Sequence, residues 1–212
     1  MSTGTDTDNA LVATADAAEY LGSTNSTDNW GKINDLINAA AYRFNAETGR
    51  LLKSRSHTEY YDGNGESYLY LNNWPLSSTT ITITINANRS FSDTDDVVTS
   101  TDVMLSTDYG LVRLDGHTFT SGEKNVKIEY SAGYSTATAH DLVLATKEMV
   151  QLMYNRMTKK DLIGVRSESF EGGSRAYETD LPWSVKRVLD MYRDKRQVLA
   201  SGLVSTMPWS PR

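Results

Sequence analysis

The stretch Thr80-Ile81-Thr82-Ile83-Thr84-Ile85 alternates strictly between a polar and an apolar β-branched residue. Successive side chains of a β-strand point to opposite faces, so this pattern places Ile81, Ile83 and Ile85 on one face and the three threonines on the other. β-branched residues are also enriched in strands. The stretch therefore predicts a half-buried strand in the middle of the chain.

Further strand signals surround this stretch between about residues 56 and 135. Segments 58–61 and 67–71 flank Asp62-Gly63-Asn64-Gly65-Glu66, whose Asp-Gly and Asn-Gly steps favour a tight turn. We therefore predict a hairpin between these two segments. The rest of the region is assigned as short strands and a polar, acidic loop: strands at 110–114 and 125–130, and the loop at 87–102.

Both ends of the chain have helical periodicity instead. Apolar residues that recur three and four positions apart predict helices at about 28–49, 141–158 and 183–199. Thr14 or Asp16 can cap a further short helix that runs through Tyr20 and stops at Gly22. Gly22 and Gly49 follow the first two helices in chain order, as expected for glycine at a helix C-terminus. The sequence thus predicts an α+β protein with a helical body and an inserted antiparallel β hairpin or sheet domain. Its expected divisions are residues 1–55 and 136–201 for the body, 56–135 for the β domain, and 202–212 for an extended tail.

Two segments near the C-terminus do not fit the helical pattern. Residues 160–179 show little periodicity, and a stretch of this length without secondary structure is usually functional or disordered. In the tail, Pro208 and Pro211 prevent continuation of the last helix. The apolar tail residues either fold back on their own domain or insert into another protein, for which tryptophan is a favoured anchor. These residues are Leu203, Val204, Met207 and Trp209.

Composition excludes several kinds of site. The 212-residue chain contains no cysteine and three histidines, His57, His117 and His140. Disulfides, thiolate zinc sites and cysteine nucleophiles are therefore impossible, and the histidine spacing fits no helical metal motif. We expect no metal ion and no cofactor. The N-terminal residues do not resemble a secretory signal, and no apolar run is long enough to span a bilayer, so we expect no membrane partner.

Charge is distributed unevenly along the chain. The whole chain has a formal net charge of −6, whereas residues 138–212 hold 12 basic and 9 acidic side chains, a net charge of +3. The basic residues alternate with Asp180, Asp190 and Asp194, which is typical of a mixed, solvated helix surface. Tight DNA binding needs a dense patch of one sign, so sequence-specific DNA binding is not expected.

One enzymatic alternative rests on carboxylates around the predicted hairpin. Glu59, Asp62 and Glu66 lie close together in sequence, and two carboxyl groups can supply the acid and base for glycoside hydrolysis. Exposed turns are also acidic for solubility and turn geometry. Nothing in the sequence indicates the burial that would shift the pKa of either glutamate. The non-catalytic interpretation is therefore preferred, and no catalytic residue is assigned.

Several short motifs occur in an order that resembles a known family. They are Glu47-Thr48-Gly49-Arg50, Thr58-Glu59-Tyr60-Tyr61-Asp62-Gly63, Trp74-Pro75-Leu76, Glu129-Tyr130-Ser131-Ala132-Gly133-Tyr134 and Gly164-Val165-Arg166-Ser167-Glu168-Ser169. Across residues 11–195 this series resembles the head-tail connector proteins of tailed bacteriophages, also called adaptor or head completion proteins. The sequence departs from the family in its long Ser/Thr-rich region at 77–108 and its long C-terminal tail.

The resemblance implies a structural virion protein and not an enzyme. Such proteins form rings, commonly of twelve copies, beneath the portal after DNA packaging. They extend the DNA channel and provide the attachment platform for the tail. The implied partners are the portal protein, neighbouring copies of the chain, tail or stopper proteins, and double-stranded DNA that passes non-specifically. The implied location is the virion neck, after assembly in the host cytoplasm.

Three groups of residues become candidate contacts under this interpretation. Leu203, Val204, Met207 and Trp209 are expected to bind the portal. The segment containing Arg166, Glu168, Glu171, Arg175 and Glu178 is expected to line the tunnel or touch the portal, and Ile81, Ile83 and Ile85 to belong to a tail-facing β domain. Two rival functions remain: a neck-associated cell-wall hydrolase that uses Glu59 or Glu66, and a cytosolic binding module that stays monomeric.

Overall fold

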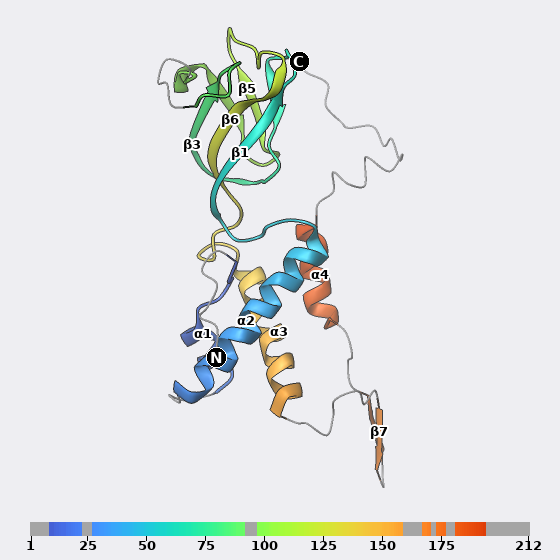
Figure 1. Ribbon diagram of the computed structural model, residues 1–212. Coiled ribbons are helices and arrows are strands. Elements are labelled where there is room, and N and C mark those ends of the chain that lie inside the picture. The colour runs from blue at the N-terminus through green and yellow to red at the C-terminus, as the bar shows by residue number, and fades with distance from the viewer. Residues whose placement is uncertain are drawn as a thin grey trace. The chain divides into compact units, whose positions relative to one another are not determined.

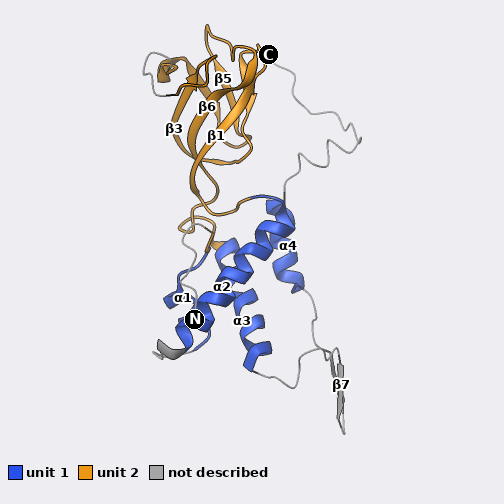
Figure 2. Ribbon diagram, viewed as in Figure 1, with its two compact units in different colours: residues 1–5, 11–50, 141–212 blue, residues 6–10, 51–140 orange. Residues whose placement is uncertain are grey.

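The computed structural model describes residues 9–22, 27–91, 97–158, 167–170, 173–176 and 181–193. The chain forms two compact units, coloured separately in Figure 2. The helical unit comprises residues 1–5, 11–50 and 141–212, and the β unit comprises residues 6–10 and 51–140. This confirms the predicted α+β fold, in which a β region is inserted between helices.

The described part of the helical unit contains four α-helices (Figure 1). They are α1 (Thr14–Tyr20), α2 (Thr27–Thr48), α3 (His140–Thr158) and α4 (Trp183–Tyr192). Helix α2 contacts both α1 and α4. The apolar stripe that predicts α2 is buried, because Ile33, Ile37 and Phe44 are fully removed from solvent. In folded proteins, most of the stability of a helix comes from packing such an apolar face.

Helices α3 and α4 run antiparallel. Ser184 Oγ, near the start of α4, donates to Glu148 Oε2 of α3 at 2.8 Å, and Tyr192 Oη, at its end, donates to Asp141 Oδ1 at 2.7 Å. Between these two contacts, α4 contributes the buried side chains of Val185 and Leu189. Polar contacts near both ends of α4 therefore tie it to α3.

The β unit consists of two three-stranded antiparallel sheets. One sheet has the order β1–β6–β3 and the other β2–β5–β4, so β6 and β5 are the central strands. The bounds are β1 Arg55–Gly63, β2 Tyr68–Tyr70, β3 Leu76–Ile85, β4 Val103–Ser106, β5 Leu111–Leu114 and β6 Gly122–Ala132. A 3-10 turn at Ser100–Asp102 precedes β4.

A hydrophobic cluster contains buried residues from both sheets. It is formed by Leu69, Leu71, Leu76, Ile83, Val112, Leu114, Phe119, Val126, Ile128, Tyr130 and Ala132. The alternation at 80–85 does form a strand, and Ile83 is only 1% exposed. Ile81 and Ile85 are partly buried against the same cluster. All three isoleucines therefore support the core of the β unit.

The predicted hairpin between segments 58–61 and 67–71 is wrong. Strand β1 pairs with β6, and β2 pairs with β5 in the other sheet. The glycines serve a different purpose, because a Cβ on Gly63 would lie 1.8 Å from the carbonyl oxygen of Thr120. Gly65 has a φ of +79°, and its N–H donates to the carbonyl of Phe119 at 2.7 Å. The turn therefore connects the two sheets, and it packs against residues 119–120, which precede β6.

A short hairpin that the sequence analysis does not predict occurs in the 160–179 segment, where little regular structure is expected. Strands β7 (Ser167–Phe170) and β8 (Gly173–Ala176) pair antiparallel within the 160–179 segment. Each strand is only four residues long, which is too short for periodicity to reveal. Across the residues that the structure describes, no helix is both long and apolar enough to span a bilayer.

Candidate functional site

The three groups of candidate contact residues differ in what the structure shows of them. Leu203, Val204, Met207 and Trp209 lie outside the described residues, as do Arg166, Glu171 and Glu178. Glu168 on β7 and Arg175 on β8 are directly opposite each other in the hairpin register. The fold thus brings together one acidic and one basic position of the segment, 168 and 175.

The carboxylate of Glu59 on β1 is the centre of a hydrogen-bond network. Tyr130 Oη donates to Glu59 Oε2 at 2.7 Å, and Tyr61 Oη also donates to this oxygen. Asn73 Nδ2 donates to Glu59 Oε1 at 2.7 Å, and Asn72 Nδ2 lies 3.4 Å from Oε2. Both oxygens of the carboxylate are therefore engaged by donors from the β1–β6 sheet and from the loop before β3.

The two tyrosine hydroxyls of this network also accept hydrogen bonds. The backbone N–H of Asn72 donates to Tyr61 Oη at 2.9 Å, and that of Asn73 donates to Tyr130 Oη at 3.2 Å. Burial, followed by the hydrogen bond to Glu59, raises the pKa of Tyr130 to about 12 and raises that of Tyr61 further. Both phenols therefore stay protonated and keep donating at any physiological pH.

The hydrogen bonds of Glu59 join the β1–β6 sheet to the loop before β3. Of the three carboxylates around the turn, Glu59 accepts hydrogen bonds from the side chains of Tyr61, Tyr130 and Asn73. Glu66 is exposed in the turn before β2, and Asp62 accepts the backbone N–H of Lys124 at 2.7 Å. Among the described residues, no group of three or more His, Cys, Asp or Glu side chains could hold a metal ion.

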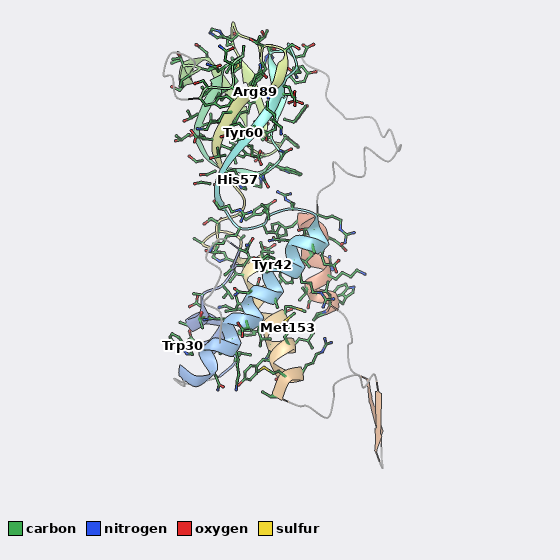
Figure 3. The ribbon with its side chains drawn as sticks, viewed as in Figure 1. Trp30, Tyr42, His57, Tyr60, Arg89 and Met153 are labelled. Carbon is green, nitrogen blue, oxygen red and sulfur yellow. The ribbon has the colours of Figure 1, made fainter. Side chains whose placement is uncertain are left out.

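A surface hollow of about 490 Å³ lies beside the network. It is lined by Thr58, Glu59, Tyr60, Asn72, Arg89, Phe91 and Lys124. The rings of Tyr60 and Phe91 have centroids 5.3 Å apart, and Arg89 pairs with Glu123 at 3.4 Å. Figure 3 shows Tyr60 and Arg89 on the β unit. Charges of both signs surround the hollow, so it has no clear preference for an anion or a cation.

Helix α4 exposes a stripe of large side chains opposite its buried face. Trp183, Arg187 and Met191 follow one another at intervals of four residues and therefore lie on one side of the helix. Trp183 is 69% exposed and Met191 59% exposed. The Arg187 guanidinium lies 5.4 Å from the centroid of the Trp183 ring. Tryptophan, arginine and methionine are enriched at protein–protein interfaces, so we name these three residues the α4 stripe.

The outward side of the β2–β5–β4 sheet is also rich in exposed aromatic and apolar residues. Leu69, Val112 and Leu114 point into the core, so the alternate residues point out. We name these outward positions the tyrosine face: Tyr68, Tyr70, Met104, Ser106, Leu111 and Arg113. The alternation at 68–70 and the four-residue spacing at 183–191 are the sequence signals from which both surfaces could have been found.

The structure therefore presents a protein with two units, each of which displays exposed aromatic side chains of the kind that bind other proteins. Residues 10–195 match the family described as Head completion protein. This match covers well over half of the chain, so the chain belongs to the Head completion protein family. Head-tail connection is accordingly its structural role, as the motif series predicts.

Two solved structures contain chains of similar fold. One is the neck of an empty gene transfer agent particle computed with C6 symmetry, with a TM-score of 0.59 and 15% identity over 95% of this chain and 94% of that chain. The other is the virion of a native gene transfer agent particle, with a TM-score of 0.58 and 16% identity over 99% and 97%. No curated protein matches the chain.

Proposed function

We propose that the chain is a head-to-tail adaptor that forms a ring beneath the portal in the virion neck. The observation that carries this proposal is the family match over residues 10–195. The ring extends the DNA channel after packaging and provides the platform for tail or stopper proteins. It acts by geometry and performs no catalysis, in agreement with the structural use of Glu59.

The α4 stripe supports assembly with neighbouring copies. A closed ring joins one surface of each copy to a different surface of the next, so a protomer can leave apolar side chains uncovered until it assembles. Trp183 and Met191 are such side chains. A chain of similar fold occurs in a neck computed with C6 symmetry, and a ring of twelve copies is compatible with a sixfold axis.

The C-terminal tail is the proposed portal anchor. Its apolar residues, Leu203, Val204, Met207 and Trp209, follow the last helix in sequence, and Pro208 and Pro211 interrupt the end of this segment. A tryptophan on a short extended segment can fill a pocket on a partner, and such residues dominate binding energy. The proposed partner of these tail residues is the portal protein.

The 160–179 segment is the proposed channel or portal contact. DNA must slide past the channel wall, so a lining that binds phosphates tightly would slow it. Glu168, Glu171 and Glu178 outnumber Arg166 and Arg175 in this segment. The β unit, with β3 and its Ile81, Ile83 and Ile85 in its core, is proposed to face the tail components.

The decisive experiment measures the mass of the full chain alone and after addition of purified portal rings. We expect about twelve copies to join each ring, from protein that is either monomeric or oligomeric beforehand. A Trp183→Ser variant should join in clearly lower number, whereas Tyr60→Ser, which removes a 52%-exposed ring from the β unit, should join normally. Failure of the unaltered chain to add mass to the portal would overturn the proposal.

A further inference from the structure

The tyrosine face is a continuous surface and not a set of scattered residues. Tyr68 of β2 is the register partner of Arg113 on β5, which is in turn the partner of Met104 on β4. In the adjacent row Tyr70, Leu111 and Ser106 are partners in the same way. The rings of Tyr68 and Tyr70 meet edge to face with centroids 6.3 Å apart. The face therefore crosses all three strands of the sheet.

Arg113 gives this face a specific chemical character. No side chain in the described part of the chain forms an ion pair or hydrogen bond with its guanidinium. The six positions of the face contain this one cation and no acidic residue. A guanidinium offers planar donors that match a carboxylate in a two-pronged geometry. An unpaired arginine between a tyrosine and a methionine is thus suited to an acidic side chain within an apolar surround.

We infer that the tyrosine face is the surface by which the β unit holds a tail-side protein, and that the partner presents an aspartate or glutamate within an apolar patch. This inference rests on the proposed adaptor function and names the binding surface for its tail-side partner. The partner's carboxylate binds Arg113, and its apolar side chains cover Tyr68, Tyr70 and Met104. Tyrosine, methionine and arginine are the residue types that form the centres of such interfaces.

Charge argues against a second copy of the chain as the occupant through the same surface. A two-fold contact of the face with itself would place its cations in one interface with no acidic residue to balance them. The isoleucines of β3 are also unsuited to direct binding, because Ile83 is buried and Ile81 and Ile85 pack against the core. The tyrosine face, unlike β3, has exposed aromatic side chains and an arginine with which no described side chain pairs.

The test uses the full chain with DNA-filled heads that lack it and with tails purified from the same particle. Three readouts are taken: the amount of chain bound to heads, the number of heads that acquire a tail, and the oligomeric mass of each purified variant. The variants are Tyr70→Ser and Arg113→Glu. Their matched controls are Tyr60→Ser, at 52% exposure against 54% for Tyr70, and Arg89→Glu, whose side chain is also exposed. All four substitutions are at surface positions, and circular dichroism confirms that each variant is folded.

We expect Tyr70→Ser and Arg113→Glu to bind heads as the unaltered chain does but to lower tail joining by about tenfold or more, as loss of an interface anchor does. The two controls should join tails normally. Equal tail joining by all variants, or equal loss in the controls, overturns the inference while the adaptor function stands. So does a lower oligomeric mass of Tyr70→Ser, which would make a second copy the occupant. If the unaltered chain does not bind heads, the adaptor function fails, and this inference fails with it.

Discussion

Tyr130 on β6 donates its hydroxyl hydrogen to Glu59 on the paired strand β1 at 2.7 Å. The same hydroxyl accepts the backbone N–H of Asn73, whose side chain also donates to Glu59. One carboxylate therefore fixes the position of a loop that has no strand partner of its own. The residue that sequence alone offers as a candidate acid is a structural acceptor.

Replacing Glu59 by glutamine should destabilise the β unit. The amide retains one acceptor oxygen but turns an NH₂ donor toward groups that are themselves donors. Leaving such partly buried donors unsatisfied costs about 1–3 kcal/mol. Urea unfolding measures the loss, and Glu66→Gln, at an exposed turn position, serves as the control with an expected change within about 0.5 kcal/mol.

The same pair of variants tests the hydrolase alternative. Neither the unaltered chain nor Glu66→Gln should release fragments from purified peptidoglycan. Release by the unaltered chain that disappears in Glu59→Gln, without loss of stability in that variant, would support catalysis and contradict the structural use of the carboxylate.

His57 should make the β unit less stable in mild acid. Its ring stacks on Tyr130 with centroids 5.4 Å apart, and its Nε2 atom is buried without a hydrogen-bond partner. Burial lowers the pKa of His57 below its usual 6.5, with smaller effects from Glu59 and Arg55. Between the lowered folded pKa and 6.5 the unfolded chain binds more protons than the folded chain, so stability falls as pH falls through this window.

A His57→Phe variant should remove that pH dependence, because phenylalanine keeps an aromatic ring against Tyr130 but does not titrate. Urea unfolding of the two proteins at pH 7.5 and at pH 5 measures the difference. His117→Phe is the control, since His117 is exposed and only 3.5 Å from Asp102 at the surface. If His57→Phe loses as much stability between pH 7.5 and pH 5 as the unaltered chain, the acid sensitivity arises from other groups.

Asn125 connects two turns of the β unit, and its loss should be costly. Its Oδ1 accepts the backbone N–H of Gly63 at 2.8 Å, and its Nδ2 donates to the carbonyl of Thr120 at 2.7 Å. The side chain is 2% exposed, so Asn125→Ala leaves the buried N–H of Gly63 without its acceptor and the part-buried carbonyl of Thr120 without this donor. We expect a loss of about 2–4 kcal/mol by urea unfolding. Asn88→Ala, at an exposed position, should be nearly neutral.

How far the sequence leads depends on the range of the interactions involved. The 80–85 alternation and the stripe through Ile33, Ile37 and Phe44 are local patterns, so they predict a strand and a helix correctly. Strand pairing is a long-range property. The local turn residues Gly63 and Gly65 therefore predict a hairpin, but β1 pairs with the distant strand β6. Thr58, for example, is the register partner of Glu129, more than sixty residues later in the sequence.

The surfaces proposed to bind partners were predictable only in part. A helix pattern reveals which residues are buried, but it does not distinguish an exposed tryptophan that is solvated from one that binds another copy. Trp183 belongs to the predicted last helix, yet its exposure follows from the packing of Val185 on the other side. Likewise, the finding that no described side chain pairs with Arg113 depends on the placement of β2 and β4 on either side of β5.

Removing residues 202–212 should separate folding from portal attachment. The tail lies beyond the elements that form either core, so the truncated chain should unfold at the same urea concentration as the full chain. It should bind portal rings far more weakly, because the proposed anchors Leu203, Met207 and Trp209 are lost. The Trp209→Ala variant is a milder test of the same anchor. Full attachment of the truncated chain would transfer portal binding to the helical unit.

Reversing the charge of the 160–179 segment should affect DNA passage and leave assembly unchanged. The triple variant Glu168→Lys, Glu171→Lys and Glu178→Lys would change three acidic positions to basic ones beside Arg166 and Arg175. Basic side chains bind phosphates by releasing counterions, so ejection of DNA should slow at low salt and recover as salt is raised. Time-resolved DNA release from assembled particles measures this. A matched triple variant with glutamine should slow release less, and equal slowing of both variants, independent of salt, would show that the segment acts through its shape and not through its charge.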